Sequence, residues 1–258
     1  MVEAEVRGDR SGERVFTTLL WPGAKPLLWP WHLERLDRDA RQMGLAAAAV
    51  GHIEAAVVDA LRSRRGDVAR VRIDLVADGG SALDEPPART LVRVAVSEPP
   101  AAGLPAQGLT LARVPTACGE GHPLAGTKRP DAVRGWARRR ATAAGFDDAL
   151  LVCARGDLVE TTTAALLLGL DDGSVVVPGQ GCGAVRSTTL AWLATRRSIA
   201  ARRVAFAECT TVRWALACNA VRGAVPVARL GDRRLQRPDG DWQQVIDAAV
   251  RATAPAGA

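Results

Sequence analysis

The side chain best suited to covalent chemistry in this sequence is a lysine. Of the 34 lysine and arginine residues only two, Lys25 and Lys128, are lysines. An arginine carries charge but is not deprotonated in proteins, whereas a neutral lysine amine can attack a carbonyl carbon. Lys128 lies in the stretch 121–131, GHPLAGTKRPD, and Lys25 lies in a turn flanked by prolines. Amine chemistry at one of these two residues is the first function that the residue types indicate.

The stretch around Lys128 also has a second interpretation, a phosphate-binding loop. Gly121 and Gly126 stand five positions apart ahead of a lysine, as in the nucleotide-binding pattern G-x-x-x-x-G-K-[ST]. The match fails at its end, because Thr127 precedes the lysine instead of following it, and Pro130 has no backbone N–H to donate. We therefore do not expect a nucleotide site here.

Length and composition indicate a globular protein of one or two domains. The chain has 258 residues, of which 48% are hydrophobic, enough to bury one large core or two smaller ones. Its longest apolar runs, such as 45–50 and 164–170, fall well short of the roughly 20 residues that cross a bilayer. The N-terminus does not resemble a signal peptide. We expect a cytoplasmic protein with no membrane partner.

Charge and cysteine content argue against two further classes. The net charge of +6 would suit nucleic acid, but the basic residues are spread along the chain. Tyrosine is absent and phenylalanine occurs only three times, which leaves few rings for stacking on bases. The five cysteines form no C-x-x-C pair. We expect no nucleic-acid partner, no bound metal and no disulfide framework.

Apolar periodicity predicts a mixed α+β chain. The predicted helices span 32–43, 50–64, 131–144, 184–200 and 241–252. The predicted strands span 2–6, 15–20, 68–76, 90–96, 109–114, 149–153, 158–159, 164–170, 174–177, 204–207, 215–217 and 225–230. Residues 101–108, rich in Pro, Gly and Ala, predict an interdomain linker. It would divide a smaller N-terminal α+β domain, residues 1–100, from a larger C-terminal domain, residues 109–258, that contains Lys128.

Several short motifs together resemble one known family. They are residues 15–18 (VFTT), 32–36 (HLERL), 124–128 (LAGTK), 145–151 (GFDDALL), 156–160 (GDLVE), 183–186 (GAVR) and 218–223 (CNAVRG), followed by Pro226 and Val227. In this order and spacing they resemble the fold-type IV pyridoxal-phosphate enzymes, which comprise branched-chain and D-amino-acid aminotransferases and aminodeoxychorismate lyase. The resemblance covers nearly the whole chain. It implies an α+β fold with a smaller N-terminal α/β sandwich and a larger C-terminal pseudo-barrel, and pyridoxal 5'-phosphate between them.

The resemblance gives catalytic roles to two residues. Lys128 would form the Schiff base with the cofactor and then move a proton at the substrate carbon, which requires an amine that can be neutral. Glu160 would pair with the pyridine nitrogen of the cofactor and keep it protonated. Judged without the other motifs, each has a plainer interpretation, a solvated loop lysine and a glutamate at an exposed strand end.

The resemblance also implies a phosphate site. Arg35, in the HLERL motif, would bind the phosphate with its planar guanidinium group, although a solvated helix arginine is the alternative. Ala184 and Val185 would offer backbone N–H groups at the start of the predicted helix 184–200. Asn219 would lie near the phosphate or the substrate carboxylate, with a turn-forming asparagine as the alternative.

The flanking residues favour one reaction within the family. Residues 16–18 and 122–126 look more like aminodeoxychorismate lyase, and Thr18 would take the place of the threonine beside its active site. We therefore expect a lyase that converts 4-amino-4-deoxychorismate to 4-aminobenzoate and pyruvate. By the same resemblance it would be a homodimer acting on a small-molecule amino substrate. The alternatives are a class IV aminotransferase for a branched-chain or D-amino acid, and a catalytically idle homologue with a binding or regulatory role.

The sequence departs from the family pattern at several places. Asp131 stands where an asparagine usually follows the lysine by three positions, and Ala165 stands where an asparagine usually follows the glutamate by five. An arginine often found at the end of the third strand is missing from residues 73–76, and the segment before residue 15 is shorter than usual. These differences bear on substrate binding and on activity.

Overall fold

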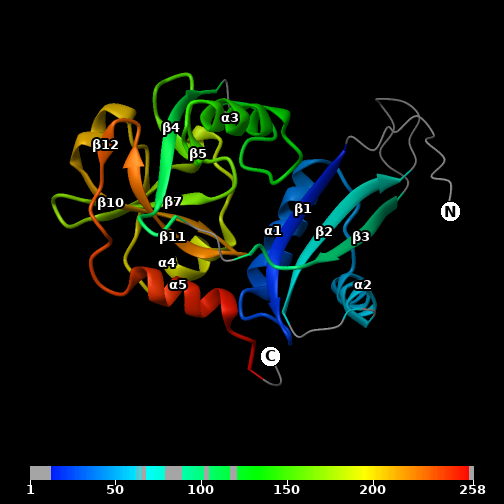
Figure 1. The fold of residues 1–258 in the computed structure, drawn as a ribbon. Coiled ribbons are helices and arrows are strands. Elements are labelled where there is room, and N and C mark those ends of the chain that lie inside the picture. Colours follow the sequence, from blue (N-terminus) through cyan, green and yellow to red (C-terminus); the bar gives the residue numbers. More distant parts are fainter. Residues whose placement is uncertain are drawn as a thin grey trace.

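The computed structural model describes residues 13–62, 64, 68–78, 89–101, 105–116 and 121–255. Its first unit is a three-stranded antiparallel sheet in the order β1-β2-β3 (Figure 1). The strands are β1 (Arg14–Pro22), β2 (Val68–Asp78) and β3 (Arg89–Ser97). They confirm three predicted strands, whereas the strand predicted at residues 2–6 lies outside the described residues.

Alternating burial over residues 14–19 of β1 assigns these side chains to two faces. Val15, Thr17 and Leu19 are buried, whereas the residues between them, Phe16 and Thr18, are half-buried on the opposite face. Successive strand residues point to opposite faces, so this pattern is expected for a sheet with one face on a core. The second face of β1, with Phe16 and Thr18, is the one that contributes to the site described below.

Two helices pack against this sheet. Helix α1 (Trp29–Gln42) begins with a proline in its first turn, and its buried residues include Arg35, Leu36 and Asp39, at helical spacing. It packs on β1 and on a later helix, α4 (Thr188–Ala194). Helix α2 (Val50–Arg62) packs on β3 at the outer side of the molecule (Figure 1). Both helices confirm the predictions from periodicity.

The second unit is a nine-stranded mixed sheet. Its path runs β6-β5-β4-β11-β10-β7-β8-β9, and β12 pairs with β11. The strands are β4 (Leu109–Pro115), β5 (Asp148–Val152), β6 (Leu158–Thr161), β7 (Ala165–Leu170), β8 (Val175–Pro178), β9 (Ala200–Arg202), β10 (Val212–Asn219), β11 (Gly223–Leu230) and β12 (Arg233–Arg234). The first strand of the path, β6, also contacts β7 and β8. The sheet therefore curls into a half-barrel, the expected C-terminal fold.

Three α-helices and two 3₁₀ helices complete this unit. They are α3 (Ala132–Ala143), η1 (Gln180–Cys182), α4 (Thr188–Ala194), η2 (Phe206–Thr211) and α5 (Trp242–Arg251). Helix α3 begins after Asp131, whose side chain accepts a hydrogen bond from the backbone N–H of Val133 at 2.9 Å. No helix in the described part of the chain is long and apolar enough to cross a membrane.

Two local predictions in this unit are wrong. The helix predicted at 184–200 is limited to α4, because Ser187 caps its N-terminus and residues 200–202 pair as β9 with β8. The strand predicted at 204–207 is replaced by the start of the 3₁₀ helix η2. In both places the structure depends on strand pairing or on a helix cap. The apolar periodicity of a short window contains no information about these two features.

One hydrophobic cluster connects the two units. It contains Leu19 and Ile73 of the three-stranded sheet together with Leu216 of β10 and Ile246 of α5. The end of the chain also returns to the first unit, where the backbone N–H of Leu27 donates to the carbonyl of Ala252 at 2.8 Å. The change of sheet between β3 and β4 falls at the predicted linker 101–108, part of which lies outside the described residues. The division into two domains stays a prediction.

Candidate active site

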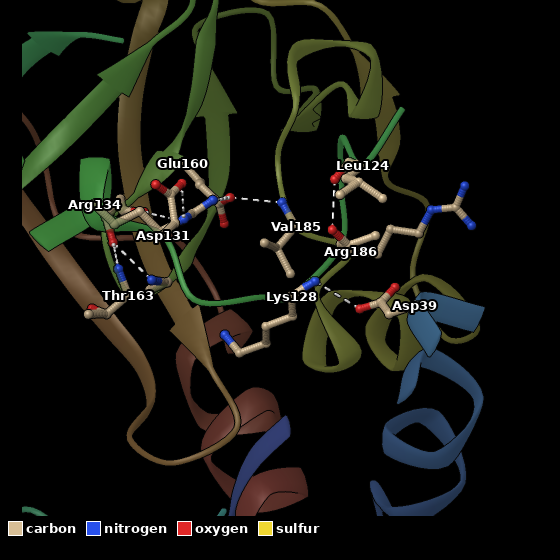
Figure 2. Close-up of polar contacts among 12 residues, drawn as sticks. Asp39, Leu124, Lys128, Asp131, Arg134, Glu160, Thr163, Val185 and Arg186 are labelled. Atoms are coloured by element: carbon tan, nitrogen blue, oxygen red, sulfur yellow. Dashed lines mark hydrogen bonds and ion pairs between the residues drawn. The ribbon is translucent and has the colours of Figure 1, made fainter. Parts of the chain in front are cut away.

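Lys128 is held by its backbone between the two units. It lies in the loop between β4 and α3, and its N–H donates to Oδ2 of Asp39 on α1 at 2.9 Å. Its carbonyl accepts a hydrogen bond from the N–H of Phe16 on β1, also at 2.9 Å. Figure 2 shows the side chain extending from this anchored backbone away from Asp39. The backbone contacts therefore fix the starting point of the lysine side chain on both sides.

The surroundings of the Lys128 amine favour its neutral form. Burial lowers its pKa to about 7, and the charge of Arg35 acts in the same direction while that of Glu160 opposes it. The nitrogen Nζ lies 5.2 Å from the centre of the Phe16 ring. Lys25 has a different role, since its Nζ pairs with Glu54 at 3.2 Å. Of the two lysines, only Lys128 has the environment of a reactive amine.

Glu160, at the end of β6, is a buried carboxylate with two donors on one oxygen. It is 4% exposed, and its Oε1 accepts hydrogen bonds from the backbone N–H of Val185 at 2.8 Å and from Nη2 of Arg134 at 2.5 Å (Figure 2). A buried carboxylate requires such partners. Its Oε2 makes no hydrogen bond within the described part of the chain. The alternative of an exposed strand end does not hold.

Arg134 in turn contacts the residue that departs from the family pattern. Its Nε lies 3.6 Å from Oδ2 of Asp131 and its Nη1 donates to the carbonyl of Thr161 at 3.3 Å. Asp131, Arg134 and Glu160 thus form a chain of alternating charges that starts at the cap of α3 and ends at β6. Such a chain orients the carboxylate of Glu160.

Arg35 is a buried guanidinium with one unpaired nitrogen. Its Nη2 donates to Oγ1 of Thr17 at 2.6 Å and its Nη1 to the carbonyl of Arg186 at 3.2 Å. Burial lowers the pKa of Arg35 to about 10, so the group keeps its charge at neutral pH. Its Nε is buried and has no partner among the residues that the structure describes. The interpretation as a solvated helix arginine is wrong, because Arg35 is 6% exposed.

Thr17 connects Arg35 to a buried histidine. Its Oγ1 also lies 2.6 Å from Nδ1 of His32, and burial together with the charge of Arg35 lowers the pKa of His32 well below its usual value. The imidazole is therefore neutral, and its Nδ1 can accept a hydrogen bond from the hydroxyl of Thr17. The hydroxyl oxygen is then oriented toward the guanidinium of Arg35.

The helix start predicted at Ala184 and Val185 differs from the structure. These residues precede α4 in an extended loop, and no helix begins at them. The N–H of Val185 donates to Glu160 instead, and Ala184 is buried away from the cavity around Lys128. Val185 thus positions the carboxylate of Glu160, and the binding of a phosphate by this segment stays a prediction.

Thr18 and Asn219 both line the space around Lys128. Thr18 does so from β1. Asn219, at the end of β10, accepts hydrogen bonds from the N–H groups of Val221 and Arg222 at 3.0 and 2.9 Å, as a turn-forming asparagine does. Its Nδ2 lies 3.4 Å from the carbonyl of Thr163. Both interpretations of Asn219 are therefore compatible, since it forms the turn and borders the cavity.

Two adjoining cavities meet at Lys128. The inner one, of about 100 Å³, is lined by Arg35, Glu160 and Val185 among others. The outer one has a volume of about 300 Å³. Both are lined by Phe16, Thr18, Lys128, Thr162, Thr163 and Asn219. The amine is thus at the boundary between a small inner space with the predicted cofactor residues and a larger outer space.

Several residues of this site were not found from the sequence. Arg134, Asp39 and Phe16 lie on three different elements, and each contacts Lys128 or Glu160 across the fold. Asp39 had a readable signal, because it follows Arg35 by four positions on α1 and so shares its face. Phe16 stood in a family motif that gave it no role of its own. The contacts of Arg134 and Phe16 required knowledge of which elements pack together.

A second polar cluster lies outside these cavities. Sulfur and oxygen atoms of Cys153, Asp157 and Cys182 all lie within 4.8 Å of one another. Asp157 is paired with Arg203, whose Nε lies 3.0 Å from Oδ2, and with Arg155 at 3.8 Å. Burial raises the pKa of the Cys182 thiol. Two guanidinium groups on the carboxylate and a protonated thiol oppose the binding of a cation there.

Comparison with known proteins identifies the family. The sequence profile described as amino-transferase class IV matches residues 14–230. The chain belongs to the class IV aminotransferase family. It is therefore a pyridoxal-phosphate-dependent enzyme, and the family and the cofactor predicted from the motifs are confirmed. The comparison with curated proteins found no match.

Solved structures of class IV enzymes share the fold. A hypothetical aminotransferase from Mycobacterium tuberculosis in its apo form superposes with a TM-score of 0.80 at 24% identity, covering 93% of this chain and 89% of that one. A protein assigned as a 4-amino-4-deoxychorismate lyase from Legionella pneumophila gives 0.77 at 18%, with coverage of 93% and 89%. The branched-chain aminotransferase of Thermoproteus uzoniensis gives 0.77 at 21%, with 93% and 84%. Lyases and aminotransferases thus share this architecture.

Proposed function

We propose that this class IV enzyme is a lyase that releases pyruvate from 4-amino-4-deoxychorismate and leaves 4-aminobenzoate. The observation that carries the proposal is the position of Lys128, whose amine has a pKa of about 7 and meets the hydroxyl-bearing face of β1 where two cavities join. Thr18 lines both cavities there, in the sequence FTT that resembles the lyases. The Phe16 ring lies beside the amine and offers an apolar surface to a cyclic substrate.

The residues of the inner cavity fit pyridoxal 5'-phosphate. The buried Nε of Arg35 lacks a partner in the described ranges of the chain, and a phosphate oxygen would satisfy it. Glu160 leaves Oε2 without a protein partner in the described part of the chain, while Arg134 and Val185 hold Oε1. An ionised carboxylate oriented in this way would hold a proton at the pyridine nitrogen. When bound, the cofactor supplies an acceptor for the electron pair left on the substrate carbon.

The protein residues then supply proton transfer and orientation. Above pH 7 the Lys128 amine is largely neutral and can take a proton from the substrate carbon beside it and return it later. Thr18 can orient the substrate by a hydrogen bond from its hydroxyl. Because the backbone of Lys128 is fixed by Asp39 and Phe16, the amine moves only through its own side-chain torsions.

An aminotransferase is the second candidate. The neighbour from M. tuberculosis was solved in an α-ketoglutarate and PMP bound form, so this architecture supports amino-group transfer. Both reactions begin with the same amine chemistry at the lysine, and the residues of the inner cavity serve either one. The family membership favours both candidates over an idle homologue.

One series of experiments tests these candidates. The purified protein is loaded with pyridoxal 5'-phosphate and reduced with borohydride, and the cofactor is expected on the peptide that contains Lys128. The Lys25→Arg variant should label equally and Lys128→Ala should not. Release of pyruvate and 4-aminobenzoate from 4-amino-4-deoxychorismate would then support the lyase. Conversion to the pyridoxamine form by an amino acid would support the aminotransferase instead. A protein that stays colourless and unlabelled would contradict both.

We also infer that the enzyme is a cytoplasmic homodimer. The resemblance to fold-type IV enzymes supports the dimer, and the exposed side chains of Val133 and Trp136 on α3 are apolar groups that a second copy could cover. Sedimentation equilibrium measures the oligomeric state. A monomer at micromolar concentration would contradict this inference.

A further inference from the structure

The outer cavity beside Lys128 has an unusual lining. Four arginines border it, Arg70 and Arg72 from β2, Arg138 from α3 and Arg222 from the turn between β10 and β11. No acidic residue is among the described residues that line it. Three separate segments thus bring positive charge to one space of about 300 Å³, and the Lys128 amine opens into the same space.

The pairing of β1 with β2 explains why two of these arginines face the cavity. In the antiparallel register Thr18 lies opposite Arg72 and Leu20 lies opposite Arg70. Residues opposite each other share a face of the sheet, and so do alternate residues along a strand. Phe16, Thr18, Arg70 and Arg72 therefore belong to one face. Residues 73–76 lack the arginine that the family often has there, but the same strand carries Arg70 and Arg72 nearer its start.

The four arginines are not equally available to a ligand. Arg72 binds both oxygens of Asp74 at 2.7 Å and its guanidinium carbon lies 3.9 Å from the centre of the Phe16 ring. Arg70, Arg138 and Arg222 are exposed, and their side chains make no hydrogen bond or ion pair within the described part of the chain. Three guanidinium groups are thus free to bind an anion, and the fourth is committed to packing.

We propose that the outer cavity is an anion subsite that binds a carboxylate remote from the reacting amine, with the free guanidinium groups of Arg70, Arg138 and Arg222 as its donors. This proposal rests on the proposed function, because the proposed function assigns the reacting amine to Lys128. The substrate is then an amine that carries two carboxylates, and amino acids with branched apolar side chains are poor substrates. A guanidinium group binds a carboxylate through two parallel N–H donors, whereas an apolar side chain would leave these charges without a partner.

Binding measurements with a matched pair of ligands test the subsite. The probes are 2-oxoglutarate and 2-oxopentanoate, which have the same carbon chain and differ by the second carboxylate. Isothermal titration calorimetry of the cofactor-loaded protein should show 2-oxoglutarate binding at least about tenfold more tightly, as a hydrogen bond to a charged group predicts. Arg138→Gln and Arg222→Gln should each reduce this ratio about tenfold or abolish it, with little change in the affinity for 2-oxopentanoate.

Arg139→Gln is the matched control. Arg139 is the next residue on α3, is also exposed and does not line the cavity, so its replacement removes the same charge without removing a donor. The ratio should stay within about twofold of the wild-type value. Equal affinities for the two ligands in the wild type, or equal effects of the Arg138 and Arg139 replacements, would overturn the subsite.

The failure of the subsite can be distinguished from the failure of the proposed function. If borohydride labels Lys128 but the ligand preference is absent, only the subsite is wrong. If the ligand preference is present, also in protein prepared without cofactor, while Lys128 does not label, the subsite is supported and the proposed function is wrong.

Discussion

Asp131 shows how a departure from a family pattern can be explained by its contacts. Its side chain caps α3 and also lies 3.6 Å from Nε of Arg134, which binds the Glu160 carboxylate. An asparagine could cap the helix equally well but would carry no charge toward the arginine. The aspartate therefore completes an alternating series of charges that ends at the proposed cofactor carboxylate.

Replacing Arg134 should weaken cofactor binding. In Arg134→Gln the carboxylate of Glu160 loses its charged donor and part of its orientation, and we expect the Kd for pyridoxal 5'-phosphate to rise about tenfold or more. Asp131→Asn keeps the cap and should have a smaller effect in the same direction. Titration of cofactor-free protein, followed by visible absorbance, gives the affinities. Arg140→Gln, on the same helix but stacked on Trp136, serves as the control, and an equal effect of both replacements would contradict the role of Arg134.

The Lys128 amine should react at lower pH than an ordinary lysine. Its pKa is lowered, so the neutral amine becomes abundant as the pH rises through about 7 and is scarce below it. In the Lys25→Arg background, where Lys128 is the only lysine, acylation of its peptide should rise with a midpoint near pH 7. The same protein unfolded in urea should show a midpoint near pH ~10.4. Coincident midpoints in the two states would show that the fold does not perturb the amine.

The residues found from the sequence and those that were missed differ in a physical way. Lys128, Glu160 and Arg35 stand in local motifs, and the structure brings all three to one inner cavity. Arg134 carries no local signal, because its importance depends on which elements pack against the lysine loop, and the motif that contains Phe16 did not indicate its contact with the lysine amine. The helix start expected at Ala184 is wrong, because Ser187 caps the helix three residues later, and the contribution of Ala184 to a phosphate site stays a prediction.

At the scale of elements, strand alternation was the most informative signal. It predicted the half-buried strands of the first sheet, and it separates Thr17, which contacts Arg35, from Thr18, which lines the cavity. The strand order was not predictable in the same way. In the sheet, strand β4 lies between β5 and β11. Both of these strands come later in the sequence, and β11 is more than one hundred residues away. Such pairings depend on long-range burial, which a local window does not contain.

The contact between β7 and β10 requires a glycine. Gly169 lies opposite Trp214, and a Cβ added at Gly169 would lie 2.1 Å from Cε2 of that indole. Gly169→Ala should therefore destabilise the protein by about 1–3 kcal/mol, as overpacked cores do. Gly51→Ala in α2 meets no atom within 4 Å and should stabilise by roughly 0.5–1 kcal/mol. Urea unfolding of both variants measures the difference, and a neutral Gly169→Ala would contradict this packing.

At the scale of the whole molecule, the two sheets share one buried core. Leu19 and Ile73 belong to the same cluster as Leu216 and Ile246, and the chain end bonds back to Leu27. Removing either sheet would expose the apolar surface of the other to water, at a cost proportional to the area uncovered. The active site has the same dependence, because the backbone of Lys128 is bound by α1 and β1 while its side chain faces residues of the second sheet.

The shared core predicts that the two sheets unfold together although the sequence indicates two domains. We expect backbone amides in β2 and in β10 to lose protection from hydrogen exchange at the same urea concentration, as measured by pulse labelling and mass spectrometry on cofactor-free protein. A tenfold dilution should leave the two midpoints equal to each other, even if association shifts both. Loss of protection in β2 at a lower urea concentration than in β10 would instead show that the smaller sheet is an independently stable unit. In that case the Lys128 backbone would lose its anchors before the second sheet unfolds, and cofactor binding would fail at the lower midpoint.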